Sequence, residues 1–316
     1  MHSIIGSNWN FQKGLIVFVL DQSQFMNEEY NKYTTRMDVA AGFINSFILE
    51  LIARCSSWRS NNEFYIRSCA HVVVIGYGGK YSDGVQILLN SRIDEIAIDA
   101  CEGRYGNQVC LLDIIERKEC NNTFVVPQAN GYNDPIIAAL ELCCEYLESW
   151  RDFANEDFYI ATPVLVNIGC GKIFNVMSDL HVKNKLVEIK KRMDDIILPD
   201  GKAMIYNIVL DKEGVPNVFP CQAPRSEEER YLFNLSSEMP KVLTNFYNYQ
   251  LANVCKDRTN TQSFIENDCF KGNEKLFISN LSVDKLKAFG YSLIDFHMHE
   301  WGGMYVGHPN DLLEEW

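Results

Sequence analysis

The sequence predicts an α/β protein with a doubly wound, mainly parallel central sheet that is flanked by helices. Short apolar runs of strand length recur along the chain, and amphipathic helical patterns separate them. The runs lie at 15–20, 71–77, 163–168 and 203–210. An uninterrupted apolar run is typical of a strand covered on both faces. Strands that alternate with helices indicate right-handed crossovers and helices on both sides of the sheet.

The first unit of this pattern is a strand, a loop and a helix. LIVFVL at 15–20 ends at Asp21. After a polar stretch, apolar residues recur at three- and four-residue steps from Met37 to Leu51, which predicts an amphipathic helix. HVVVIGY at 71–77 predicts the second strand, and we expect 85–98 to form a short hairpin or an edge extension.

The second half of the predicted sheet repeats the alternation. Pro135 opens a helical pattern that runs toward Trp150, since proline is compatible with the first turn of a helix. PVLVNI at 163–168 predicts a third strand, and AMIYNIVL at 203–210 a fourth. Between them, Ser178 or Asp179 can cap another amphipathic helix.

The pattern changes after Pro216 and suggests a division of the chain. Residues 227–251 look helical and 256–272 are polar, while 276–279 and 283–289 predict a last strand and helix. We therefore expect an α/β domain at 1–255 and a C-terminal extension at 256–316 that packs on or beside it.

Composition restricts the partners and the setting. With 29 Lys and Arg against 42 Asp and Glu, the net charge of -13 disfavours nucleic acid and anionic membrane surfaces. No window approaches the roughly 20 apolar residues that a membrane-spanning helix requires. Eleven cysteines at scattered spacings fit free thiols in a reducing cytoplasm. We expect a cytoplasmic protein with neither nucleic-acid nor membrane partners.

Three loop segments carry a family resemblance. VFVLDQSQFM at 17–26 resembles the first metal-site motif of von Willebrand factor A domains, a strand followed by Asp-x-Ser-x-Ser. GYNDPIIAAL at 131–140 resembles the family's Gly-Gly-Thr-Pro-Leu helix entry, and VLVNIGCG at 164–171 its strand ending in Thr-Asp-Gly. Later segments are similar to bacterial cytoplasmic members of the tellurium-resistance type, which are often encoded beside a kinase and a phosphatase.

The resemblance implies a metal-ion site whose ligands are only partly conserved in this chain. In the family, hydroxyl and carboxylate groups from these loops surround a divalent cation, usually magnesium. Asp21 and Ser23 match the pattern, and Asp134 stands where a threonine is expected. Phe25 replaces the second serine and Cys170 replaces the last aspartate. Magnesium requires hard oxygen ligands, which neither replacement supplies.

Several interpretations of these departures stay open. The site is degenerate and holds no cofactor, or Asp21, Ser23 and Asp134 hold a weakly bound Mg²⁺, or a thiophilic ion such as zinc uses Cys170. The local alternative is that Asp21 merely ends a strand and caps the next loop. The pair His297 and His299 with His308 is explained better by a glycine-rich tail than by a metal site.

The preferred functional hypothesis is a protein-recognition module rather than an enzyme. Tyrosines of the surrounding loops would form the partner-binding face, because tyrosine contributes contact area and a hydrogen bond at low entropic cost. The candidates are Tyr30, Tyr33, Tyr81 and Tyr105. The resemblance implies a partner such as a kinase, a phosphatase or another operon product in a bacterial stress or defence system. The competing hypothesis is a metal-dependent switch or an enzyme that uses Asp21, Ser23, Asp134 and Cys170.

Overall fold

The computed structural model describes most of the chain between residues 14 and 300. The described residues are 14–58, 64–79, 84–106, 108, 110, 113–114, 123–127, 135–154, 161–173, 180–198, 201–212, 215–254 and 270–300. The candidate residues Tyr81, Asp134 and His308 lie outside this set.

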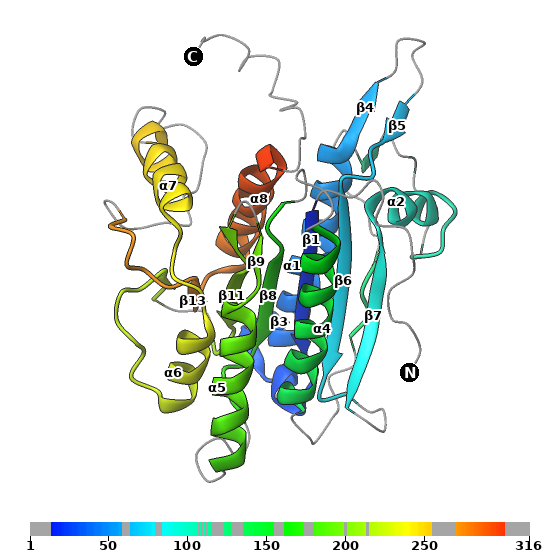
Figure 1. Cartoon of the computed structure of the whole chain (residues 1–316). Helices are drawn as coiled ribbons and strands as arrows, with labels where there is room; N and C mark the ends of the chain where they lie inside the picture. The colour runs from blue at the N-terminus through cyan, green and yellow to red at the C-terminus, as the bar shows by residue number, and fades with distance from the viewer. Residues whose placement is uncertain are drawn as a thin grey trace.

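A seven-stranded, mostly parallel sheet forms the centre of the molecule (Figure 1). Its strands are β1 (Gly14–Asp21), β6 (Ala70–Tyr77), β7 (Val85–Arg92), β8 (Val164–Gly169), β11 (Met204–Val209), β12 (Asn217–Val218) and β13 (Phe277–Ser279). Their order across the sheet is β12-β13-β11-β8-β1-β6-β7. The five strands from β13 to β6 are parallel to their neighbours, and the edge strands β12 and β7 are antiparallel. The expected mainly parallel α/β sheet is confirmed.

Helices cover both faces of this sheet. They are α1 (Arg36–Cys55), α2 (Ile93–Cys101), α4 (Ile136–Ala154), α5 (Leu180–Asp194), α6 (Glu227–Leu235), α7 (Lys241–Val254) and α8 (Val283–Glu300), with the short 3₁₀ helix η1 (Gln24–Asn27). Three two-stranded pairs lie outside the central sheet: β2 (Glu29–Asn31) with β3 (Thr34–Thr35), β4 (Ser56–Trp58) with β5 (Phe64–Ile66), and β9 (Ile197–Leu198) with β10 (Gly201–Lys202).

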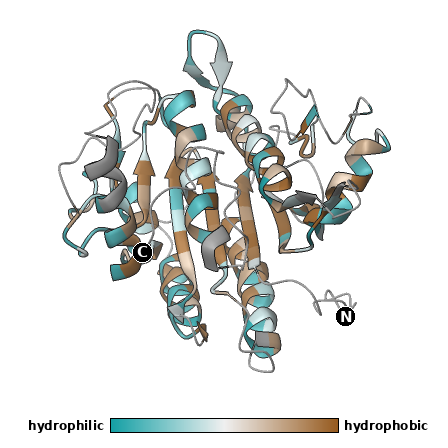
Figure 2. Ribbon diagram, turned by 90° about the horizontal axis from the view of Figure 1, so that it is seen from above, coloured by the Kyte–Doolittle hydropathy of each residue, from teal (hydrophilic) through white to brown (hydrophobic). Residues whose placement is uncertain are grey.

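Alternate residues of β1 belong to two separate hydrophobic cores. Ile16, Phe18 and Leu20 pack with α1, α2, α7 and α8, whereas Leu15, Val17 and Val19 pack with α4, α5 and α6. Every residue of β1 is buried, because helices exclude water from both sides of the strand. Figure 2 shows hydrophobic colouring in the central strands, with helices on either side of them.

A capping box fixes the start of α1 beside the end of β1. The Thr35 hydroxyl accepts a hydrogen bond from the backbone N–H of Asp38, and the Asp38 carboxylate accepts one from the N–H of Thr35. This reciprocal pair satisfies two of the donors that a helix start leaves free, which is typically worth about 1 kcal/mol. It sets where Arg36, the first helical residue, enters the loop region.

Two expected elements differ in the structure. Residues 85–98 do not form a hairpin: β7 pairs with β6, and Ile93 begins helix α2 instead. The isoleucines and alanines of α2 are buried at three- and four-residue spacing, so they pack as one helical stripe. The helical pattern at 227–251 is divided into α6 and α7, with Pro240 immediately before α7.

The part of the expected C-terminal extension that the structure describes contributes to the main core. β13 pairs in parallel with β11 and antiparallel with β12. The following helix α8 packs against α1, with Phe289 stacked at 6.2 Å from Phe43, ring centre to ring centre. Gly290 makes this contact possible, because a Cβ atom there would lie 2.9 Å from the Phe43 ring.

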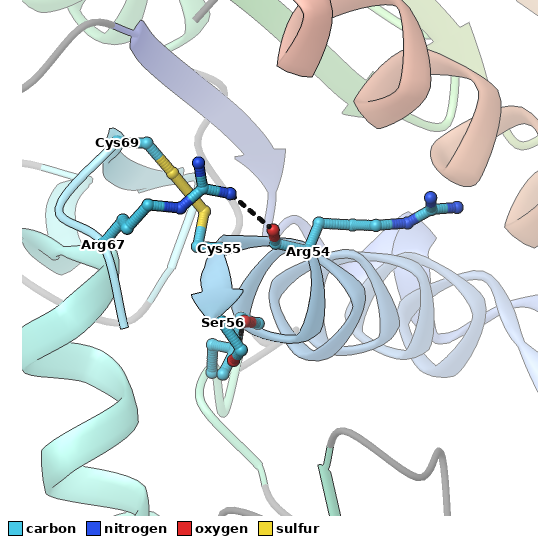
Figure 3. The surroundings of a disulfide bond; sticks show 6 residues. Arg54, Cys55, Ser56, Arg67 and Cys69 are labelled. Atoms are coloured by element: carbon cyan, nitrogen blue, oxygen red, sulfur yellow. Dashed lines mark hydrogen bonds between the residues drawn. A yellow bond between two sulfur atoms is a disulfide. The ribbon is translucent and has the colours of Figure 1, made fainter. Parts of the chain in front are cut away.

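A disulfide joins the end of α1 to the start of β6 (Figure 3). Cys55 and Cys69 are bonded across a separation of 14 residues, with their Cα atoms 6.6 Å apart. Arg67 makes two hydrogen bonds to the end of α1. Its backbone N–H donates to the Cys55 carbonyl, and its guanidinium donates to the Arg54 carbonyl. The expectation of free thiols is therefore wrong for these two cysteines, which the turn brings within bonding reach.

None of the helices within the described ranges has the length and apolar character that crossing a membrane would require.

Candidate functional site at the carboxyl ends of β1 and β8

Asp21 joins two loops at the carboxyl edge of the sheet. Its side chain is buried, and its two oxygens accept different backbone N–H groups: Oδ1 from Ser23 at 2.8 Å and Oδ2 from Cys170 at 3.2 Å. The first bond shapes the turn after β1, and the second ties that turn to the end of β8. The two turns that the sequence placed at this edge, at positions 21 and 170, are thus in direct contact.

Glycines allow the loops to approach this closely. A Cβ atom on Gly169 would lie 3.1 Å from the Asp21 Cβ and 3.1 Å from the Tyr77 hydroxyl. Gln22 crosses to the end of β6, where its backbone N–H donates to the Tyr77 carbonyl. Its side chain lies directly against Gly76, because a Cβ there would overlap the Gln22 amide nitrogen at 1.7 Å. Larger residues at 76 or 169 would separate the three strand ends.

Ser23 and Phe25, which come after Asp21 in the sequence, lie in different environments. Ser23 is buried, and its hydroxyl oxygen has no hydrogen-bond partner among the residues described. Phe25, partly buried, packs against the hydrophobic core to which α1 contributes. The Lys172 ammonium lies over the Phe25 ring, 4.2 Å from its centre. An aromatic ring and a lysine therefore lie where the family pattern has a metal-binding hydroxyl.

Arg36 links three segments beneath this rim. Its guanidinium is buried and donates to the Phe25 carbonyl at 3.0 Å and to the Glu28 carboxylate at 2.8 Å. It also donates to the backbone carbonyl and the carboxylate of Asp211, at 2.6 and 3.0 Å. Lys172 lies 3.8 Å from Glu28 and adds a second cation to the network. Sequence reasoning missed both cations, because neither belongs to a recognised motif.

Cys170 is buried between two glycines and stays protonated. Burial is the main cause that raises the pKa of its thiol, and the neighbouring Asp21 carboxylate raises this pKa further. Arg36 and a backbone hydrogen bond with Lys172 act in the opposite direction but are weaker. Because the thiolate is the nucleophile and the metal-binding form, a raised pKa disfavours both catalysis and zinc binding at this position.

Of the third predicted turn, the one before helix α4, the structure describes only the last residue, Pro135. Asp134 itself lies outside the described residues, but Pro135 precedes α4 and packs on Gly84, where a Cβ would lie 2.6 Å from the proline ring. Gly84 is bonded to the end of β6, since its carbonyl accepts from the Gly78 N–H at 2.7 Å. The entry to α4 is therefore at the same edge of the sheet as Asp21.

Of the four tyrosines proposed as a partner-binding face, the three that the structure describes do not form one exposed surface. Tyr30 is 2% exposed and its hydroxyl donates to the Leu281 carbonyl, so it is a core residue and not a surface anchor. Tyr33, at the β2–β3 turn, is 83% exposed. Tyr105 is partly buried against Phe124 and follows α2, a helix that begins where β7 ends beside the start of β6. Tyr81 lies outside the described residues.

No group of three or more His, Cys, Asp or Glu side chains is arranged to hold a metal ion within the part of the chain that the structure describes. His297 is buried in α8, beside the Phe296 ring. Because 283–300 is helical, residues 297 and 299 do not share a face as they would on a strand.

Comparisons with known proteins give little further information. No protein family matches the sequence, and no curated protein matches it. Among solved structures, the PilB minor pilin from Streptococcus sanguinis is similar with a TM-score of 0.38 and 10% sequence identity. The match covers 96% of this chain and 65% of that one, so the chain spans less than two thirds of the pilin structure. A likeness at this level supports no argument about function.

Proposed function

We propose that this chain is a protein-recognition module of the von Willebrand factor A type, which docks a protein partner on the loops at the carboxyl edge of its sheet. The strand order supports the proposal. With the two-residue strand β12 left out, the strands in chain order lie 3-2-1-4-5-6 across the sheet, as in doubly wound folds. In such sheets, ligands bind where the strand order reverses, which here is the edge between β1 and β8.

The observation on which the proposal depends most is the bond from the Cys170 N–H to Asp21. It brings the Asp-x-Ser loop and the Gly-Cys-Gly loop together at the reversal point. Around them, Arg36 fixes Phe25, Glu28 and the end of β11 in one network. A rim whose loops are held rigidly before binding loses less entropy when a partner docks.

The described residues at this rim do not fit a magnesium ion. Only Asp21 and Ser23 offer hard oxygen atoms at the predicted positions, and both Asp21 oxygens already accept backbone hydrogen bonds. Magnesium demands close to six oxygen ligands in octahedral geometry. The Lys172 ammonium above Phe25 would also repel a cation. We propose a degenerate site without a bound cation, beside which Arg36 and Lys172 form ion pairs with Glu28 and Asp211.

The biological setting is also part of the proposal. The resemblance suggests a bacterial stress or defence system, with a kinase, a phosphatase or another operon product as partner. The net charge of -13 argues against nucleic acid and anionic membranes. A cytoplasmic setting was inferred from free thiols, and the Cys55–Cys69 disulfide weighs against that reasoning.

The test is quantitative affinity capture from the native cell with rim variants. Lys172→Glu reverses a rim charge, and Tyr33→Ala removes an exposed ring. The matched control is Lys241→Glu, which makes the same charge change on exposed α7, away from the rim. We expect one protein to be retained by the wild type and the control but depleted at least tenfold with Lys172→Glu. Equal recovery with all variants would refute docking at this rim.

A second candidate, a metal-dependent switch or enzyme using Asp21, Ser23, Asp134 and Cys170, is favoured by one observation. The buried Ser23 hydroxyl has no hydrogen-bond partner among the described residues, and a bound ion would satisfy it. Melting temperatures measured with millimolar magnesium, manganese or zinc distinguish the two candidates, because an ion bound only to the folded state must stabilise it. A shift that Asp21→Ala abolishes would favour the switch.

A further inference from the structure

A cavity of about 490 Å³ opens at the amino end of the sheet, opposite the Asp21 rim. It lies where β8 and β11 begin, between the last turn of α5, the strand β10 and the α6–α7 connection. Residues from all of these segments line it. Its volume is within the range typical of pockets for small molecules, roughly 300–1,000 Å³. Nothing in the proposed docking function uses this end of the molecule.

The lining combines three lysines with two acids, and among the described residues the exposed Lys202 is the one lysine of the three without an acidic partner. Lys190 is paired with Asp194, and the Lys275 ammonium lies 3.5 Å from the Glu238 carboxylate. Lys202, on β10, forms no ion pair with any residue that the structure describes. In a protein of net charge -13, one unopposed ammonium group in a cavity favours a ligand with a single negative charge.

A buried hydroxyl also belongs to the lining. Thr162, just before β8, is 3% exposed, and its Oγ1 atom has no hydrogen-bond partner among the described residues. A buried polar group without a partner is unfavourable, so a ligand oxygen that bonded to this hydroxyl would be favoured. Gly201 adjoins it: a Cβ there would lie 3.8 Å from Thr162 Oγ1.

Apolar side chains complete the cavity. Met204 and Met239 are buried and line it, and Val242 lines it from the first turn of α7. Methionine side chains adapt readily to the shape of a ligand because they are flexible and polarisable. A ligand that fits this lining has a charged end and an apolar part.

We propose that this cavity binds a small organic monocarboxylate, whose carboxylate lies between Lys202 and Thr162 and whose apolar chain contacts Met204, Met239 and Val242. Phosphate fits less well, because its second charge would have to compete with Asp194 and Glu238 for the paired lysines. The cavity and the Asp21 rim are independent, so either proposal can fail without the other.

The first test is titration of the full chain with sodium hexanoate, followed by isothermal calorimetry and by melting temperature at constant ionic strength. Inorganic phosphate and 1-hexanol serve as probes of charge alone and of apolar character alone. We expect saturable binding of hexanoate, at least tenfold tighter than that of either probe. Equal effects of hexanoate and phosphate would overturn the proposal, because they would indicate a general anion effect. Equal effects of hexanoate and hexanol would overturn it too.

Variants then test whether Lys202 and Thr162 contact the carboxylate of hexanoate. Lys202→Gln should weaken hexanoate binding at least tenfold, and Thr162→Val should weaken it severalfold while keeping the shape of the side chain. Lys191→Gln is the matched control, since Lys191 is exposed on α5 and does not line the cavity. It should leave hexanoate affinity unchanged. Unchanged affinity in Lys202→Gln would overturn the proposal.

A measurement on the unaltered protein avoids any effect of the variants on folding. The amine of Lys202 is acetylated with a limiting reagent, and mass spectrometry measures how far hexanoate slows the reaction. Lys191 provides the reference rate in the same sample. We expect at least fivefold protection of Lys202 and none of Lys191. Equal rates at Lys202 with and without saturating hexanoate would exclude contact between the carboxylate and this ammonium group.

Discussion

The Asp21 carboxylate accepts the backbone N–H of Cys170 at 3.2 Å, across 149 residues of sequence. The same carboxylate accepts the Ser23 N–H at 2.8 Å. One buried side chain therefore accepts hydrogen bonds from two loops, which follow the neighbouring parallel strands β1 and β8. The geometry of the whole rim depends on a group that can accept at both oxygens.

Replacement of Asp21 by asparagine should destabilise the protein, although it keeps the shape of the side chain. An amide accepts at only one of its two ends, so either the Ser23 or the Cys170 N–H would face a donor. We expect a loss of about 1–3 kcal/mol in the free energy of unfolding, measured by urea denaturation. Asp152→Asn is the control, since its exposed carboxylate should change stability by less than about 0.5 kcal/mol. Equal stabilities would show that these bonds contribute nothing.

Under the proposed von Willebrand factor A assignment, introducing the two ligands that this chain lacks should create a metal site. The double substitution Phe25→Ser with Cys170→Asp adds a hydroxyl and a carboxylate beside Asp21. Without metal, we expect a melting temperature below that of the wild type, because two buried carboxylates repel each other. Millimolar magnesium should raise it again, while the wild type shows no such rise. No magnesium effect in a folded double variant would contradict the assignment of these positions.

The disulfide between Cys55 and Cys69 should contribute measurably to stability. Its closed loop is short, and a loop of about 15 residues is associated with roughly 3 kcal/mol. A reductant should lower the melting temperature of the wild type and leave a Cys55→Ala, Cys69→Ala double variant unchanged. Thiol titration of the unfolded chain should detect two fewer thiols before reduction than after it. Equal thiol counts would show that the bond is absent in the isolated protein.

Glu274 should make stability depend on pH. Burial by itself would raise the pKa of this carboxyl, but the N–H groups of Lys271, Gly272 and Asn273 and its own N–H together lower it below the ordinary value. A carboxyl whose pKa is lowered by folding stabilises the protein fully above its unfolded pKa, roughly 4.3. That contribution is lost as the pH falls through the folded pKa.

The corresponding measurement compares Glu274→Gln with the wild type by urea denaturation between pH 7 and pH 3. The variant should be less stable at neutral pH, and the difference should shrink below about pH 4 as the wild-type carboxyl is protonated. Glu29→Gln, at an exposed position on β2, is the control and should follow the wild type at every pH. A difference that stayed constant down to pH 3 would exclude the ionised form as the cause.

The central strands could be predicted from sequence because their signal is local. Burial on both faces requires uninterrupted apolar residues, so 15–20 and 71–77 were identified to within a residue or so of β1 and β6. The secondary structure of the segment 85–98 is harder to predict, since isoleucine occurs in strands and in buried helix faces alike. The deciding signal was the three- and four-residue spacing from Ile93 to Ala100, all on one face of α2.

The contact of positions 21 and 170 also followed from sequence, because parallel neighbouring strands bring their carboxyl ends to one edge. The network around them did not. Arg36, Gln22 and Lys172 are placed by tertiary contacts, and no spacing rule identifies their partners. Likewise, a tyrosine in a polar loop gives no sign that it is buried, and Tyr30 is covered by a segment about 250 residues away.

The late position of β13 has a consequence for how the chain acquires its structure. β11 has β8 on one side, but its other side is completed only by residues 277–279. Until those residues leave the ribosome, the apolar strand MIYNIV has an open row of backbone donors and acceptors, which can pair with another nascent chain. Chaperone demand should therefore peak between the synthesis of β11 and that of β13, and fragments that stop at residue 255 should aggregate.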